Sequence, residues 1–173
     1  MADAAGVSRG LFERPVIAGR VVLSDLAPAA LDAMPWLVPA LAPEWSQADL
    51  EAAVADGTGV LIGDAAGAAI GVAVVRLEAP SAGSAVISFL AIDPGRRFRG
   101  LGGEAGLALD AQLRNKGFQR VYAPVPDGRG LAVYFWLRLG FRPLLQGESP
   151  GAVVGLKQEP MRGIWMLRGP GSE

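Results

Sequence analysis

The fold is decided by residues 85–117, which read AVISFLAIDP, GRRFRGLGG and EAGLALDAQLRNKG. The first part is a continuous apolar run rich in β-branched and aromatic side chains, and this predicts a buried strand. Asp93-Pro94-Gly95 ends the strand, because proline cannot donate to a ladder and glycine permits a sharp turn. The last part has leucines and alanines at helical spacing and closes on Lys116-Gly117, so it predicts a helix with a defined C-terminal end.

Between this strand and this helix lie three arginines and three glycines: Arg96, Arg97, Arg99, Gly100, Gly102 and Gly103. The first turn of a helix leaves backbone N–H groups unpaired and carries a partial positive charge. Glycines let a phosphate approach those donors closely, and arginines add charge and forked hydrogen bonds. The segment therefore predicts an anion-binding cradle.

Two nucleotide-binding interpretations fit the cradle less well. A P-loop would end in Gly-Lys-Ser/Thr, and the chain has Gly103-Glu104 there. Gly100-x-Gly102-x-x-Ala105 formally matches a dinucleotide fingerprint, but a polar loop separates it from the preceding strand. No carboxylate ends the next predicted strand, Arg120–Pro124, where a ribose would need one. A nucleotide-dependent oxidoreductase is therefore the weaker alternative.

An acyl-CoA-binding pattern fits the cradle better than either nucleotide-binding motif. Arg97-x-x-Gly100-x-Gly102, after a strand ending Leu90-Ala91-Ile92-Asp93-Pro94, resembles the acyl-CoA signature Gln/Arg-x-x-Gly-x-Gly/Ala of the GNAT superfamily of N-acetyltransferases. Downstream, AVYFWLRLGF at 132–141 resembles the second helix of that family and its Gly-Phe exit. The two motifs occur in the family's order and together cover about residues 84–143.

The resemblance implies an α/β fold of the α+β type: a mixed, mostly antiparallel twisted sheet of six to seven strands, a parallel central pair that splays apart, and about four helices. A flexible leader over 1–14 would precede one domain over 15–173. From the residues themselves we expect further strands at 20–23, 59–62, 69–77, 119–124, 141–144 and 163–167, and helices at 28–34, 46–57 and 130–139.

In the family pattern, backbone groups of the central strand pair with the pantetheine arm of acetyl-CoA, and N–H groups of the cradle hold its pyrophosphate. The implied cofactor-binding residues are Leu90, Ala91, Ile92, Arg97, Phe98, Arg99, Gly100, Leu101, Gly102, Gly103 and Trp136. Glu104 lies in the first turn of the same helix, so its carboxylate must point away from the phosphates for this interpretation to hold.

The chain departs from the family in its second helix. Arg129 stands where many members have Asn, and Trp136 stands where many have the Tyr credited with protonating the thiolate. Tyr134 does not replace it, because two residues on a helix turn the side chain by about 200°. We assign no catalytic residue. Ser88 in the central strand and Glu78 after the preceding strand have two interpretations. Either they order a water molecule for catalysis, or Ser88 is an ordinary strand hydroxyl and Glu78 an ordinary turn carboxylate.

The amino-acid composition excludes several kinds of catalytic and metal-binding site. The chain of 173 residues has no cysteine and no histidine, which excludes a thiolate nucleophile, a Ser-His-Asp relay and a Cys/His zinc site, and we expect no metal.

Residues 1–93 carry 4 basic and 11 acidic side chains, whereas residues 94–173 carry 12 basic and 6 acidic side chains. Either these are solvated surface charges, or the basic half suits a polyanionic cofactor and the acidic half a cationic acceptor. No spanning helix, secretory signal or nucleic-acid surface is predicted, and a cytoplasmic location follows.

The sequence thus predicts an acetyl-CoA-dependent N-acyltransferase acting directly on a primary amine of a small molecule or a peptide. The acceptor site would be framed by Pro35–Trp45, the following helix and the loop Gln146–Pro160. A non-catalytic acyl-CoA-binding module is the alternative, motivated by Trp136 and Arg129. A second copy of the chain is a candidate partner, as a homodimer.

Overall fold

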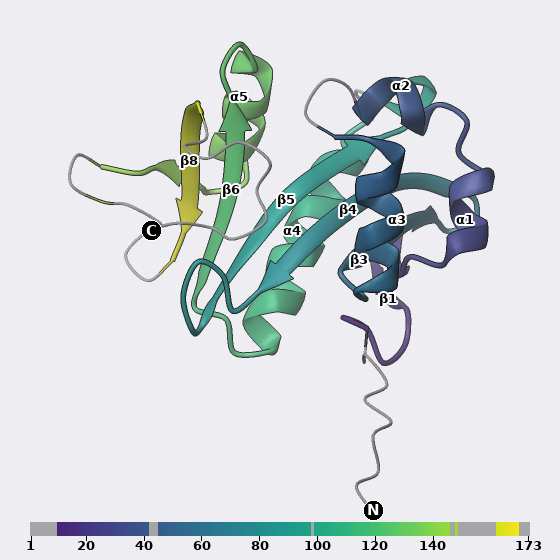
Figure 1. Cartoon of the computed structure of the whole chain (residues 1–173), viewed down its shortest axis with the longest axis horizontal. Coiled ribbons are helices and arrows are strands. Elements are labelled where there is room, and N and C mark those ends of the chain that lie inside the picture. The colour runs from purple at the N-terminus through teal and green to yellow at the C-terminus, as the bar shows by residue number, and fades with distance from the viewer. Residues whose placement is uncertain (1–9, 42–44, 98, 146–147, 149–161, 170–173) are drawn as a thin grey trace, which may run out of the picture.

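A computed structural model describes residues 10–41, 45–97, 99–145, 148 and 162–169. These form one open sheet of eight strands in the order β1-β2-β3-β4-β5-β6-β8-β7 (Figure 1). The strands are β1 (Val16–Ala18), β2 (Val21–Asp25), β3 (Gly59–Asp64), β4 (Ala69–Leu77), β5 (Ser84–Ile92), β6 (Arg120–Pro126), β7 (Arg142–Pro143) and β8 (Gly163–Arg168). All neighbours are antiparallel except β5 and β6, so the predicted fold class and its parallel central pair are confirmed.

Five α-helices cover the two faces of the sheet within the described residues. They are α1 (Pro28–Asp32), α2 (Leu37–Leu41), α3 (Gln47–Ala55), α4 (Leu101–Asn115) and α5 (Gly130–Arg138). Side chains of a strand alternate between faces, and in β4 Ala73 and Val75 pack in the cluster with α4 and α5 while Val72 and Val74 pack with α1, α2 and α3. Near-continuous apolar sequence in β4 and β5 is the consequence of burial on both faces.

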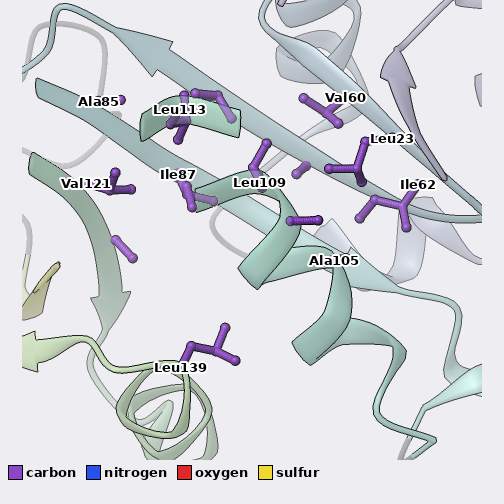
Figure 2. Packing of buried hydrophobic residues seen from close by; sticks show 14 of the residues in the cluster. Leu23, Val60, Ile62, Ala85, Ile87, Ala105, Leu109, Leu113, Val121 and Leu139 are labelled. Carbon is purple, nitrogen blue, oxygen red and sulfur yellow. The ribbon is translucent and has the colours of Figure 1, made fainter. Parts of the chain in front are cut away.

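Helix α4 packs its apolar face into the main core. Its buried side chains Ala105, Leu109 and Leu113 recur at helical spacing and lie over Ile87 of β5 and the inner strands (Figure 2). Leu139, at the end of α5, reaches the same cluster. This packing fixes the N-terminus of α4 against the end of β5, which is where the cradle lies.

The central pair separates after a short contact. β5 and β6 are paired only from Ser84 to Val86 on one strand and from Arg120 to Tyr122 on the other. Beyond that point β5 continues to Ile92 paired with β4 alone, and β6 continues paired with β8 alone, so the two strands diverge (Figure 1). The predicted splay is present, and we call the opening between the strands from Ile87 onward the notch.

Three local features differ from the sequence expectation. The sheet has eight strands because β1, a strand of three residues, was not predicted, whereas the strand predicted at 141–144 is present as the two-residue β7. Helix α2 forms although Pro39 lies inside it, because a proline in the first turn removes an N–H that has no helical partner. Leu11 and Phe12, within the predicted leader 1–14, are buried in the core; residues 1–9 lie outside the described part. Among described residues, no helix is both long and apolar enough to cross a bilayer.

Candidate active site

A large cavity of about 1110 Å³ runs along the notch. One end is lined by the cradle between β5 and α4, the middle by facing residues of β5, β6 and α5, and the other end by α3 and the last residues of β4. Because α4 and α3 cover opposite faces of the sheet, the cavity passes through the sheet at the notch. A ligand in it would touch both faces.

The cradle is shaped by two local turns. Asp93 accepts a hydrogen bond from the backbone N–H of Gly95 at 2.8 Å, which folds the chain into the short 3₁₀ turn Pro94–Arg96. Gly100 is the N-cap of α4 with φ +80°, a left-handed conformation that favours glycine. The N–H of Glu104 donates to the carbonyl of Gly100 at 3.1 Å as the first helical bond. The N–H groups of residues 101–103 therefore precede the helical ladder, as an anion site requires.

Gly102 limits what fits in the cradle. A Cβ atom at this position would lie 3.5 Å from Ile92 and from Phe135, which is ordinary van der Waals contact. A methyl group is therefore tolerated, whereas a longer side chain would have to extend into the cavity. The closeness of Gly102 to Ile92 also brings the start of α4 next to the end of β5.

The arginines of the cradle have different surroundings. Arg96 pairs with Asp64 of β3 at 3.2 Å, and the pKa of Asp64 is lowered mainly by the backbone N–H of Ala68 and less by this arginine. Arg97 donates from Nε to the carbonyl oxygen of Ile92 at 3.2 Å, so it closes the loop onto the end of β5. Arg99 is exposed and, within the described part of the chain, does not line the cavity.

Backbone groups of β5 face the notch in alternation. The N–H of Asp93 donates to the carbonyl of Ile70, on the β4 side. Successive residues of a strand turn their N–H and C=O groups to opposite neighbours, so residues two apart face the same one. Leu90 and Ile92 therefore direct theirs toward the notch, and Ala91 directs its own toward β4, where its carbonyl lies close to Gly71. All three residues line the cavity.

Glu104 borders the cavity beside the cradle, and its carboxylate is bound by Arg20. Its carboxylate accepts hydrogen bonds from the backbone N–H of Arg20 at 2.8 Å and from Nε of the same arginine at 2.8 Å. Arg20 lies in the turn between β1 and β2. These hydrogen bonds lower the pKa of Glu104 below its usual value of 4.5. That this carboxylate points away from bound phosphates stays a prediction; the structure shows that Arg20 pairs with it.

The opposite end of the cavity is formed by α3. The residues that line it are three or four positions apart and therefore share one face of the helix: Asp49, Ala52, Ala53 and Asp56. The predicted start of this helix is confirmed: the N–H of Ser46 donates to Asp49 at 2.7 Å and the N–H of Asp49 to Ser46 at 3.4 Å, a reciprocal capping box.

Aromatic and charged side chains complete this end. Trp45 packs against Phe89 of β5 with ring centroids 5.3 Å apart. Thr58 and Arg76 also line the cavity, beside the last residues of β4. The predicted acceptor frame therefore has its α3 part at the cavity, whereas residues 42–44 and most of the loop 146–160 lie outside the described residues.

Ser88 is a polar residue of β5 that lines the cavity. It lies two residues beyond the last β5–β6 pair, at a register shift opposite Val74 and Val75. The residue is buried and lines the cavity, and its Oγ has no hydrogen-bond partner among the described residues. Glu78, the other water-ordering candidate, accepts from the N–H of Gly83 at 2.7 Å in the exposed β4–β5 turn. Glu78 is thus a turn carboxylate, and Ser88 is the one of the two at the cavity.

Trp136 both packs in the core and borders the cavity. It is 6% exposed, and its ring centroid lies 5.0 Å from that of Phe135 and 4.8 Å from that of Phe141. Tyr134 is more than half exposed at the cavity rim, with the guanidinium of Arg138 5.9 Å from its ring centroid. Both residues line the cavity, and they differ in that Trp136 is buried and Tyr134 is exposed.

The structure brings together most of the predicted cofactor residues. Those that line the cavity are Leu90, Ala91, Ile92, Arg97, Gly100, Gly102, Gly103 and Trp136. The side chain of Leu101 is buried in the core, and Phe98 lies outside the described residues. Sequence analysis did not single out Arg76; a charge at the end of the apolar run of β4 was the available signal.

The sequence matches a known protein family over the part of the chain that contains the cradle and the notch. The family model of the acetyltransferase (GNAT) family matches residues 28–141. No curated protein matches the sequence of the chain.

Solved structures share the fold. An acetyltransferase from Thermus thermophilus is 22% identical with a TM-score of 0.63, covering 88% of this chain and 99% of its own. A GCN5-related N-acetyltransferase from Kribbella flavida is 20% identical with a TM-score of 0.62, covering 87% and 98%. N-acetylglutamate synthase from Neisseria gonorrhoeae, complexed with coenzyme A and N-acetyl-glutamate, is 17% identical with a TM-score of 0.66; the match covers 88% of this chain and 36% of the synthase.

Proposed function

The chain belongs to the acetyltransferase (GNAT) family, and we propose that it moves an acetyl group from acetyl-CoA directly to a primary amine of a small molecule or a peptide. The observation that carries the proposal is the continuity of one cavity from the α4 cradle, through the notch, to the α3 face. A donor held from one face can then meet an acceptor entering from the other, which is what direct transfer needs.

The cradle fits the phosphates of the donor. Backbone N–H groups of residues 101–103 and the positive end of α4 suit a pyrophosphate, and Arg97 adds a positive charge at the cavity. Gly102 leaves open the space in which a phosphate would lie. Leu90 and Ile92 offer backbone groups to an extended arm in the notch, although the carbonyl of Ile92 already accepts from Arg97.

The thioester of acetyl-CoA supplies an activated acyl group. In the transfer the amine nitrogen bonds to the carbonyl carbon, the carbon–sulfur bond breaks, and the amine proton passes to water as the thiolate takes one from water. Ser88 lies where the strands separate, and its Oγ suits a hydrogen bond to the acceptor nitrogen or its water. Asp49 and Asp56 at the α3 end favour an acceptor that arrives as an ammonium ion.

The test is release of free thiol from acetyl-CoA on addition of amines. The panel contains diamines, amino acids, aminosugars and peptides with a free N-terminus or lysine, and the product is identified by mass spectrometry. We expect one class of amine to gain the mass of one acetyl group with one equivalent of thiol released. Tight coenzyme A binding without transfer to any amine would favour the non-catalytic module, and absence of coenzyme A binding would overturn the proposal.

A further inference from the structure

The phosphate cradle contains a carboxylate that should oppose its purpose. Glu104 lies in the first turn of α4, within one turn of the donors of residues 101–103, and its side chain is 30% exposed. A negative charge at a helix N-terminus stabilises the helix but competes there with an anionic ligand. An uncompensated Glu104 would therefore weaken binding of a polyphosphate in the cradle.

Arg20 compensates this charge with an unusually complete set of contacts. Its backbone N–H and Nε each lie 2.8 Å from a Glu104 oxygen, and its terminal nitrogen also donates to that carboxylate. The same terminal nitrogen donates to the backbone carbonyl of Arg99 at 2.8 Å. One side chain from the β1–β2 turn thus fastens both the loop before α4 and its first turn.

The close approach depends on glycine in both partners. A Cβ on Gly19 would lie 2.7 Å from Glu104, and Gly19 itself has φ +60°. A Cβ on Gly100 would lie 3.3 Å from the guanidinium of Arg20. A side chain at either position would therefore make the Glu104 carboxylate or the Arg20 guanidinium shift, and glycine leaves room for this contact beside the N-cap of α4.

We propose that Arg20 is a positioning residue for the phosphates of coenzyme A: it neutralises Glu104 and fixes the Arg99 carbonyl, so that the N-terminus of α4 stays attractive to anions. The inference rests on the proposed function, because it assumes that the cradle binds those phosphates. Arg20 lies 84 residues from Glu104 in sequence and outside every motif that indicated the cofactor, so the contact gives the β1–β2 turn a role in cofactor affinity.

The test separates this electrostatic role from a mechanical one. Coenzyme A binding is measured by titration calorimetry for the wild type, Arg20→Gln, Glu104→Gln and the double variant, at low (about 50 mM) and high (about 300 mM) salt. We expect Arg20→Gln to weaken binding about tenfold at low salt, because the carboxylate is then unopposed, and about threefold at high salt, because salt screens exposed charges. Glu104→Gln should stay within about threefold of wild type, and the double variant should regain most of the lost affinity.

Two results would overturn the inference. Either Arg20→Gln binds coenzyme A like the wild type, or the double variant binds as weakly as Arg20→Gln at both salt concentrations, which would mean that the contact acts only as a clamp. Thermal unfolding of each variant without ligand verifies that it is folded. If the wild type itself does not bind coenzyme A, the proposed function fails, and this outcome is distinct from both.

Discussion

The carboxylate of Asp110 in α4 lies 3.4 Å from Nε of Arg168, the last residue of β8. Asp110 also pairs with Arg114 at 3.1 Å, and Arg168 donates to the carbonyl of Leu139 at the end of α5 at 2.6 Å. A nearly buried carboxylate thus joins the main helix, the second helix and the C-terminal strand, which lie far apart in the sequence.

Asp110→Ala should lower the free energy of unfolding by about 2 to 3 kcal/mol, because removing one partner leaves a half-buried guanidinium without its carboxylate. Urea denaturation gives this value. Arg114→Gln is the control, because it leaves Asp110 paired with Arg168, and it should cost clearly less than Asp110→Ala. Equal effects of the two substitutions would contradict the role given to Asp110.

Ser88→Ala should reduce turnover of the identified amine by about 10- to 100-fold while leaving coenzyme A affinity unchanged, because Ser88 lies where β5 and β6 separate and not in the cradle. It should also leave the folded state equally or more stable, since a buried hydroxyl without a partner costs free energy. The measurements are steady-state kinetics and thermal unfolding.

Ser84→Ala is the matched control for Ser88. Ser84 is buried in the same strand, but its hydroxyl lies 3.1 Å from that of Ser81. Its loss should reduce stability by about 1 kcal/mol with little change in turnover. A Ser88→Ala variant with wild-type turnover would show that this hydroxyl has no part in transfer.

Gly71→Ala should displace β5 from the β4 side and thereby change the notch. A Cβ on Gly71 would lie 2.7 Å from the carbonyl oxygen of Ala91, a backbone atom that cannot move without displacing β5. We expect a loss of about 1 to 3 kcal/mol in unfolding free energy and a roughly fivefold or greater weakening of the affinity for coenzyme A. Gly130→Ala meets no atom within 4 Å and should change neither quantity appreciably. If Gly71→Ala is destabilised but binds coenzyme A with unchanged affinity, the position of β5 does not determine cofactor binding, which would contradict the account.

The Arg20–Glu104 pair predicts a pH dependence of stability. The pKa of Glu104 is lowered from 4.5 mainly by its hydrogen bonds with Arg20, so the folded state binds a proton at this site less readily than the unfolded state. The contribution is therefore fully present above about pH 4.5 and is lost as pH falls through the lowered folded-state pKa. The stability difference between wild type and Glu104→Gln should be largest near about pH 6 and shrink toward about pH 3. A difference that stays constant over this range would contradict the assignment.

Much of the fold could be predicted because its signals are local. The apolar run of β4, the strand–turn–helix unit from β5 to α4 and the Ser46 capping box each depend on residues close in sequence. The parallel pairing of β5 and β6 follows from a single helix between them, which makes a crossover. These elements also carry the motif that indicated the cradle.

The rest depends on contacts between distant residues. Arg20 reaches Glu104 across 84 positions, and nothing in the β1–β2 turn alone indicates a partner in α4. Likewise, Ser84 has a hydroxyl partner in Ser81 whereas Ser88 has none among the described residues and lies at the cavity, and tertiary structure decides both differences. Helix α2 escaped prediction because Pro39 reads as a helix breaker until its place in the first turn is known.

The most direct test of the cofactor site is thermal unfolding with acetyl-CoA, coenzyme A, NADPH and ATP in parallel, for the wild type, Gly102→Ala and Gly102→Glu. A ligand at a hundred times its dissociation constant adds about 2.7 kcal/mol to stability, which for a chain of this size is a rise of roughly 5 to 10 °C. We predict that rise for acetyl-CoA and coenzyme A in the wild type and Gly102→Ala, and its loss in Gly102→Glu, whose longer side chain enters the cradle. No rise with millimolar acetyl-CoA in the wild type, or an equal rise in Gly102→Glu, would contradict the account.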